Sequence, residues 1–293
     1  MHDYHFRVAR AIRQTTAEIM LPRYRALSAD DVEEKAPGEI VTTIDRAMET
    51  ALGAALAEIA PHARFVGEEA CESDPRLLDG LDRGDVWIVD PLDGTSNFTA
   101  GCGHFGVIVA YASGGVVEAA WLYDPLADRM CHATRGGGAF VDNERIHTVA
   151  TDTKRPVAAL ATQFMPSKTR QILIERVEAH FDLVAIPRCA AEHYPRLALG
   201  QNQIALFQRT LPWDHAAGAL LLTEAGGHVA RWDGTPYVFH DGRRGILAAT
   251  TASGWRSAQA ALFADDCELH EQTELLPQSL VITINNDNIL AKD

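Results

Sequence analysis

The sequence predicts a mixed α/β protein whose two halves differ in character. In the first half, apolar runs separated by glycine-rich turns form hairpin patterns, which are typical of an antiparallel sheet. From about residue 150, strand-like and helical segments alternate, as they do in α/β folds. A length of 293 residues is enough for one large domain or two packed halves. We therefore expect a first half over residues 1–148, a second over 149–266, and a tail over 267–293 that is compatible with an edge strand or a disordered end.

The chain is expected to begin with helices. Residues 4–27 place apolar side chains such as Phe6 at near-helical spacing, which predicts an amphipathic helix. The polar segment 28–39 contains proline and glycine and predicts a mobile loop. A short strand then delivers Asp45 to the N-cap of a second helix, which is expected to end near residue 60.

The remaining elements follow from the period of their apolar residues. The expected strands of the first half are residues 65–66, 86–89, 106–112, 116–124 and the hairpin over 130–141. The second half is expected to contain strands at 157–162, 183–187, 204–207 and 245–250, with helices at 168–181, 190–200, 213–225 and 254–263. The strand over 86–89 is predicted to end at Asp90 and to break at Pro91.

Composition excludes several classes of function. A formal net charge of −14 opposes passive binding to nucleic acid or to an anionic membrane. The five cysteines are widely spaced without a CxxC pair, so we expect neither a disulfide framework nor a zinc site, and a reducing cytoplasm is the expected location. No run reaches the roughly 20 apolar residues that span a bilayer.

The acidic turn after residue 89 is the first candidate for chemistry. Asp90 and Asp93 leave the end of a strand, and a bend at Pro91 and Gly94 would let both carboxylates converge on a divalent cation. The backbone N–H groups of Gly94, Thr95 and Ser96 would form an anion nest. An ordinary Asx turn explains the same residues equally well.

Three further carboxylates stand near predicted element ends. Glu68 and Glu69 follow a short strand, although adjacent glutamates are more often a solvated turn. Asp214 opens a helical run rich in small residues, where it would serve as an N-cap or reach a metal ion. His215 beside it is expected to be a packing or surface residue rather than a ligand.

Together these segments resemble the inositol monophosphatase family. GEEA (67–70), WIVDPLDGTSNF (87–98) and PWDHAAG (212–218) match its glutamate motif and its two signature regions in order and approximate spacing, over residues 1 to about 265. The glycine hairpin TRGGGAFVDNERI (134–146) is also similar to the family pattern. The resemblance implies an αβαβα five-layer sandwich of the inositol monophosphatase and fructose-1,6-bisphosphatase type, and a Li⁺-sensitive phosphomonoesterase that depends on Mg²⁺, with Mn²⁺ as a substitute.

The resemblance also implies roles for individual residues. Glu68, Asp90 and the carbonyl of Leu92 would bind one metal ion, and Asp90, Asp93 and Asp214 a second. The other implied roles fall to Glu69 at a weaker third ion, to Lys35 near the metals, and to Asp45 and Thr95, which with Glu68 would activate the attacking water. Two ions about 4 Å apart stabilise both the attacking and the leaving oxygen, so no residue need become phosphorylated. The implied substrate-binding residues are Asp93, Gly94, Thr95, Ser96, Arg188 and Ala190.

Two departures from the family pattern concern the substrate. The acidic residue that family members acting on inositol phosphates carry seven positions before the WD aspartate is Phe207 here, and the family's Gly-Ser pair is Arg188-Cys189. Arg188 or Arg209 would meet a second anionic group, or would be surface arginines.

We expect a phosphatase of a small polyol or sugar phosphate, with inositol-1-phosphate as the default substrate. The alternatives are a 3′(2′),5′-bisphosphate nucleotidase, a histidinol-phosphate phosphatase, a fructose-bisphosphate phosphatase, or a non-catalytic protein that binds phosphate through metal ions. The expected partner is a small phosphorylated metabolite, with neither nucleic acid nor membrane, and the expected assembly is a homodimer.

Overall fold

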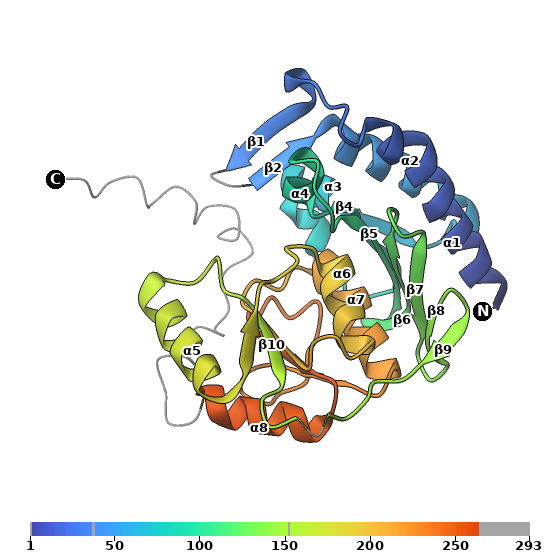
Figure 1. The fold of residues 1–293 in the computed structure, drawn as a ribbon. Coiled ribbons are helices and arrows are strands. Elements are labelled where there is room, and N and C mark those ends of the chain that lie inside the picture. Colours follow the sequence, from blue (N-terminus) through green and yellow to red (C-terminus); the bar gives the residue numbers. More distant parts are fainter. Residues whose placement is uncertain (1, 37–38, 152, 264–293) are drawn as a thin grey trace.

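Five layers of helix and sheet make up the computed structural model, which describes residues 2–36, 39–151 and 153–263. Two outer helices cover a seven-stranded sheet, two inner helices separate this sheet from a five-stranded one, and two more helices close the far side (Figure 1). Three clusters of buried apolar side chains fill the spaces between the layers. The predicted layered α/β architecture is confirmed.

The first layer contains α1 (His2–Thr15) and α2 (Thr43–Ile59). A π-helical turn (Thr16–Met20) and a 3₁₀ turn (Leu21–Arg23) extend α1, so the predicted opening helix is present with an irregular end. Its apolar face packs on the first sheet, with one exception. Phe6 was predicted to face the core, but 61% of its surface is exposed. The neighbouring residues His5 and Val8 face the sheet, and Phe6 lies at the side of the helix, where it lines a surface hollow.

The seven-stranded sheet has its strands in chain order, with β3 parallel to β4 and the other pairs antiparallel. The strands are β3 (Arg64–Gly67), β4 (Asp85–Asp93), β5 (Gly106–Ser113), β6 (Val116–Asp124), β7 (Arg129–Thr134), β8 (Gly138–Val141) and β9 (Glu144–Ile146). Gly114 and Gly115 both adopt positive φ in the β5–β6 turn, which explains why the predicted hairpin forms there.

The inner layer contains α6 (Ala190–Ala198) and α7 (Pro212–Glu224). They pack closely, because a Cβ atom on Gly218 would lie only 2.0 Å from the ring of Tyr194. Short helical segments complete the first half: α3 (Glu68–Ser73), η4 (Pro75–Leu78) and α4 (Thr95–Thr99).

The five-stranded sheet has the order β11-β10-β12-β14-β13. The strands β10 (Val157–Ala161), β11 (Asp182–Val184) and β12 (Ile204–Phe207) are parallel, whereas β14 (Ile246–Ala249) and β13 (His228–Ala230) complete antiparallel pairs. The helices α5 (Ser167–His180) and α8 (Ala252–Phe263) cover its outer face. The first sheet ends at Ile146 and the second begins at Val157, while a division into halves at residue 148 stays a prediction.

The segment over 28–39 is not the predicted loop. It contains a 3₁₀ turn (Ala29–Asp31) and β1 (Val32–Ala36), which pairs antiparallel with β2 (Glu39–Thr42). Apolar and polar residues alternate only weakly along these strands. The hairpin forms a two-stranded sheet of its own and does not join a larger sheet with one buried face. The predicted tail over 267–293 lies outside the described residues.

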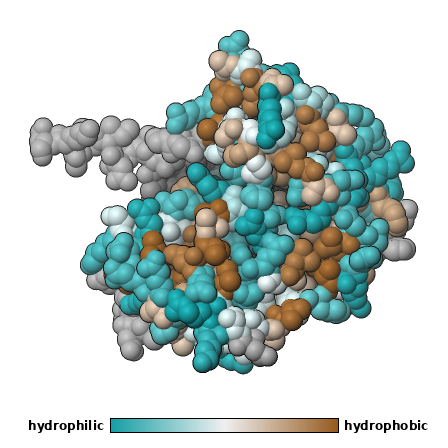
Figure 2. All heavy atoms as spheres, viewed as in Figure 1, coloured by the Kyte–Doolittle hydropathy of each residue, from teal (hydrophilic) through white to brown (hydrophobic). Residues whose placement is uncertain are grey.

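Three observations bear on the expectations from composition. Four of the five cysteines lie in the described residues, and these four, Cys71, Cys102, Cys131 and Cys189, are free. Among the helices of the described residues, none combines the length and apolar character needed to cross a membrane. On the face shown in Figure 2, hydrophilic side chains surround several separate hydrophobic patches.

Candidate active site

A β-bulge places the two aspartates of the acidic turn. Asp90 pairs with Ile108 and Asp93 with Gly106, so three steps along β4 oppose two steps along β5. In a regular strand, residues three apart point to opposite faces, but the extra residue of a bulge restores them to the same face. The predicted break at Pro91 is therefore wrong: β4 continues to Asp93, and the bulge supplies the bend that the chemistry needs.

Both aspartates are buried, with 2% of the surface of Asp90 and 9% of that of Asp93 exposed. The Leu92 N–H donates to Asp90 Oδ1 at 3.0 Å, and the Ala191 N–H donates to Asp93 Oδ2 at 2.5 Å. Burial raises the pKa of Asp90, and the negative charges of Glu68, Asp93, Asp214 and Asp45 raise it further. Burial likewise raises the pKa of Asp93 to about 6, against the opposing effect of the Ala191 N–H. The carboxylates thus lie within electrostatic reach of one another in a dry environment.

Asp45 lies at the third position of α2 rather than at the predicted N-cap. Thr42 is the N-cap, and its N–H and hydroxyl donate to Asp45 Oδ2 at 2.7 and 2.6 Å. This capping box holds the carboxylate rigidly and leaves Oδ1 directed to Thr95, whose Oγ1 lies 3.0 Å away. The same Oγ1 lies 2.9 Å from the Leu92 carbonyl oxygen. The structure therefore brings together Asp45 of α2, Leu92 of β4 and Thr95 of α4.

Glu68 and Glu69 are the first two residues of α3, where the N-terminal end of a helix favours negative charge. Glu49 on α2 accepts from the N–H groups of Glu69 and Ala70 at 2.8 and 2.9 Å. A Cβ atom on Gly67 would lie 2.2 Å from the Glu49 carboxylate, so any larger residue there would displace that carboxylate from α3. The sequence analysis missed Glu49, although its position four residues after Asp45 on one helix face was a usable signal.

Asp214 occupies the third position of α7, with Pro212 at the first and Leu211 as N-cap, so the predicted N-cap role is wrong. His215 is a core residue, as predicted: its ring contacts the Tyr194 hydroxyl through Nδ1 at 2.9 Å and the Arg209 carbonyl through Nε2 at 3.0 Å. Burial lowers the pKa of His215 to about 3, so the ring is neutral.

The segment that leads into α6 lies against Asp93. The Cys189 thiol donates to the Asp93 carbonyl oxygen at 3.8 Å, and a Cβ atom on Gly94 would lie 3.2 Å from Cys189 Cβ. Arg188 has a φ of +55°, a conformation that favours glycine, which stands at this position in the family pattern. Gly94 also has positive φ and caps α4, so the first N–H groups of that helix, on Thr95 and Ser96, lack helical acceptors.

Phe207 is buried within an aromatic cluster. Its ring stacks on Tyr194 at 5.2 Å and meets the rings of His193 and His215 at 4.7 and 4.8 Å. This buried aromatic cluster, here called the aromatic wall, stands at the position where the family pattern of inositol phosphatases has an acidic residue.

The donors fit a hard divalent cation, because they are carboxylates and one carbonyl oxygen. Among the described residues, no three His, Cys, Asp or Glu side chains already converge tightly enough to complete a coordination shell. The other carboxylates still affect the pKa of Asp90, because Coulombic repulsion acts beyond ligand distances.

Comparison with known proteins decides the family. The model of the inositol monophosphatase family matches residues 2–271. The chain belongs to this family. Its members are metal-dependent phosphomonoesterases, so the chain has the fold and the enzyme class that its motifs predicted.

Individual relatives agree with this assignment. Nus factor SuhB of Escherichia coli K12 is 31% identical over 239 residues, which cover 80% of this chain and 87% of that protein. Inositol-1-monophosphatase of Bacillus subtilis is 28% identical over 237 residues, covering 78% and 85%. The crystal structure of extragenic suppressor protein suhB from Bartonella henselae superposes with a TM-score of 0.78 at 26% identity, covering 90% of this chain and 100% of that one.

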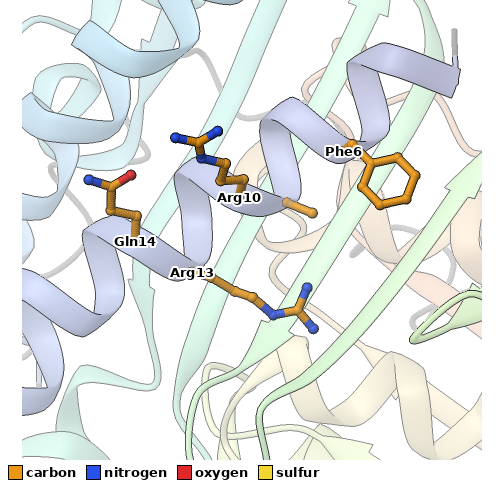
Figure 3. A pocket seen from close by; sticks show the side chains of 5 residues that line it. Phe6, Arg10, Arg13 and Gln14 are labelled. Carbon is orange, nitrogen blue, oxygen red and sulfur yellow. The ribbon is translucent and has the colours of Figure 1, made fainter.

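Two hollows lie away from these residues, along α1. An open one of about 430 Å³ is lined by α1 side chains, including Phe6, Arg10 and Arg13 (Figure 3). The other, of about 340 Å³, lies between α1 and the β7–β8 hairpin, with His132 and Phe140 stacked along it. Neither contains a residue of the candidate site.

Proposed function

We propose that this family member hydrolyses the phosphate ester of a small polyol or sugar with the help of two or three Mg²⁺ ions, for which Mn²⁺ can substitute. Glu68, Asp90, the Leu92 carbonyl and Asp93 would hold the ions together with Asp214, and Glu69 would support the third. The observation that carries the proposal is the buried carboxylate of Asp90, which is destabilised by four other carboxylates. Bound cations would remove that repulsion, and they would draw the donors together.

Asp45 and Thr95 would position the attacking water. A hydroxyl donates one proton, so Thr95 donates to Asp45 or to Leu92, and its lone pairs remain free to accept from a water molecule. Asp45, held by its capping box, can take the proton that this water loses as its oxygen bonds to phosphorus and the ester P–O bond breaks. When bound, Mg²⁺ supplies Lewis acidity that neutralises charge on the phosphoryl group and on the leaving oxygen.

The phosphate itself would meet the N–H groups at the start of α4. Gly94, Thr95 and Ser96 provide these donors, and the αL conformation of Gly94 directs them to one side. Asp93 and Ala190 would contact the alcohol, with Arg188 beside them. These roles, like those of the metal ligands, are proposals that rest on the geometry and on the family motifs.

Inositol-1-phosphate is the reference substrate, since the Bacillus subtilis relative bears the name inositol-1-monophosphatase. Phe207 weakens this choice, because an apolar wall leaves polyol hydroxyl groups without partners. Bisphosphorylated nucleotides, sugar bisphosphates and histidinol phosphate are the other candidates. The name Nus factor belongs to the Escherichia coli relative, and we do not transfer it to this chain. The net charge of −14 opposes binding to nucleic acid here. The cytoplasmic location, the homodimer and Li⁺ sensitivity stay predictions.

A panel of phosphate esters tests the proposal. Purified protein with Mg²⁺ is expected to release inorganic phosphate from at least one member of a panel that contains inositol-1-phosphate, sugar phosphates, nucleotides and histidinol phosphate. Chelation by EDTA should abolish the release, and readdition of Mg²⁺ or Mn²⁺ should restore it. A protein that releases no phosphate from any member with either ion would favour the non-catalytic alternative.

A further inference from the structure

The short helix α3 carries two of the proposed metal ligands but contributes little to its own placement. It has six residues, of which Glu68 and Glu69 are the first two. Its N-cap is Gly67, which has no side chain to accept from the first N–H groups, and these groups lack acceptors within the helix. A helix of this length is unstable by itself, so contacts from other elements must fix the direction of both glutamates.

Glu49 on α2 supplies such a contact. Its Oε2 atom accepts from the Glu69 N–H at 2.8 Å, and its Oε1 atom accepts from the Ala70 N–H at 2.9 Å. Bonds to two successive N–H groups fix both the position and the rotation of the first turn, whereas one bond would leave the turn free to rotate. A carboxylate provides an acceptor at both ends of its fork, which an amide does not.

Gly67 leaves the space that this carboxylate occupies. A Cβ atom on Gly67 would lie 2.2 Å from Glu49 Oε2 and 2.4 Å from Glu49 Cδ. The φ of Gly67 is −104°, which any residue can adopt, so glycine is needed here for space and not for backbone conformation. Glu49 thus gives a physical reason for the glycine that precedes the two glutamates.

The helix that carries Glu49 is itself firmly placed. Apolar side chains of α2 are fully buried in the cluster that joins it to the first sheet. Asp45 lies one turn before Glu49 on α2, and its Oδ1 atom lies 3.0 Å from Thr95 Oγ1. One rigid helix therefore contacts both the proposed water-positioning pair and the segment that carries Glu68.

We propose that Glu49 is a positioning residue of the metal site, which holds α3 so that Glu68 and Glu69 point toward the ions. Its two oxygen atoms are directed to the backbone of α3, so its effect passes through these ligands. Loss of a residue that orients metal ligands typically weakens metal binding by about 10- to 100-fold. This inference rests on the proposed metal-dependent function and adds a residue that lies outside the three motifs.

Binding of Mn²⁺ in the absence of substrate tests the inference. Titration calorimetry would compare wild type with Glu49→Gln, which retains one acceptor, and with Glu49→Ala, which retains none. The Kd of Mn²⁺ is expected to rise by about 10- to 100-fold in the alanine variant and by less than about 10-fold in the glutamine variant. The kcat at saturating Mg²⁺ should fall by a smaller factor, because a high metal concentration restores occupancy. A purely structural role would lower the melting temperature of the metal-free protein and leave the Kd unchanged.

Gly67→Ala separates geometry from charge. It retains every carboxylate but places a methyl group where the Glu49 carboxylate lies, so the Kd of Mn²⁺ should rise by about 10-fold. Combined with Glu49→Ala it should have no further effect, because both changes act on the same contact. Gly53→Ala on α2 is the matched control, since its new Cβ atom would meet the Phe65 ring at an ordinary 3.6 Å, and it should leave the Kd unchanged.

Three results would overturn the inference. They are equal Kd values in Glu49→Gln and Glu49→Ala, an unchanged Kd in Gly67→Ala, and a loss from Gly67→Ala that is equally large in the Glu49→Ala background. Each would leave the proposed phosphatase function intact, because wild type would still bind Mn²⁺. A wild-type protein that binds no Mn²⁺ and releases no phosphate would instead refute the proposed function together with the inference.

Discussion

The two sides of the site differ in charge and in origin. On one side, the end of β4, the start of α3 and the first turn of α7 present buried or half-buried carboxylates, which repel the carboxylate of Asp90. On the other, the edge of the second sheet presents Arg188, Arg209 and Arg244 next to an aromatic wall at Phe207. The acidic side matches the family motifs residue by residue, while the basic side departs from them. We infer that the reaction is set by the first side and the choice of alcohol by the second.

The largest expected effect is on the acidic side. Asp93→Asn removes one charge from the proposed metal ligands and should lower kcat by about 10²- to 10³-fold in a phosphate-release assay with Mg²⁺. Asp85→Asn is the matched control, since it makes the same change at the other end of β4, and it should retain normal turnover. Normal turnover of Asp93→Asn would contradict the inference that the acidic side sets the reaction.

Thr95 tests the water-positioning part of the acidic side. Thr95→Ala should lower kcat by about 10²-fold, because the proposed water loses its hydrogen-bond partner next to Asp45. Thr95→Ser should retain most activity. Thr99→Ala removes a hydroxyl that donates to the Ser96 carbonyl at 3.1 Å within the same short helix, and it should change kcat very little. Steady-state kinetics measures kcat for each variant. Equal kcat values for Thr95→Ser and Thr95→Ala would contradict a role for the Thr95 hydroxyl.

The two histidines beside Phe207, His193 and His215, should make the stability of the protein depend on pH. Burial lowers the pKa of His193 and His215 to about 3, from about 6.5 in the unfolded chain. Their contribution to stability is therefore complete above pH 6.5 and is lost as the pH falls toward 3, by about 2 kcal/mol for each histidine at pH 5. Urea unfolding between pH 7 and pH 5 measures this loss.

His193→Phe should reduce the loss of stability between pH 7 and pH 5, because His193 packs on Phe207 and its Nε2 atom has no hydrogen-bond partner. Substitution of the exposed His147 by glutamine should leave the pH dependence unchanged. An unaltered slope in His193→Phe would mean that the aromatic wall does not hold this histidine neutral.

The smallest effect is expected at Arg188. Arg188→Gly and Arg188→Ala both remove the guanidinium group, so any change in KM should be the same in the two variants. Only glycine relieves the positive φ, and it should therefore be more stable than the alanine variant by about 1 kcal/mol. Thermal unfolding compares the stability of the two variants directly. Equal melting temperatures would show that the positive φ at position 188 costs no stability.

Most of the fold could be predicted, because its elements have clear periods and glycine-rich turns. The β5–β6 hairpin and the alternation after residue 150 are examples. The β1–β2 hairpin was missed because its residues are polar and make a separate small sheet. Asp45 and Asp214 were each assigned to an N-cap, whereas each lies at the third helical position, because Thr42 and Leu211 were not recognised as the caps.

The acidic side was predictable because its residues form short local motifs, and the bulge in β4 only refined how Asp90 and Asp93 meet. The pairing of Arg209 with Arg244 depends on the register of β12 and β14, which are far apart in sequence. Glu49 shared a helix face with Asp45, yet its role as a cap for α3 needed the approach of Gly67. The register between strands that are far apart in the sequence could not be predicted from the sequence alone.

The central claim is that four carboxylates from three elements bind a pair of metal ions, and that the bulge in β4 turns Asp90 and Asp93 to the same face. Anomalous diffraction from a crystal soaked in Mn²⁺ tests this most directly. The account predicts at least two peaks bound by Glu68, Asp90, the Leu92 carbonyl, Asp93 and Asp214. A fully occupied crystal whose Mn²⁺ peaks lie elsewhere, or that shows one ion without Asp93, would contradict it.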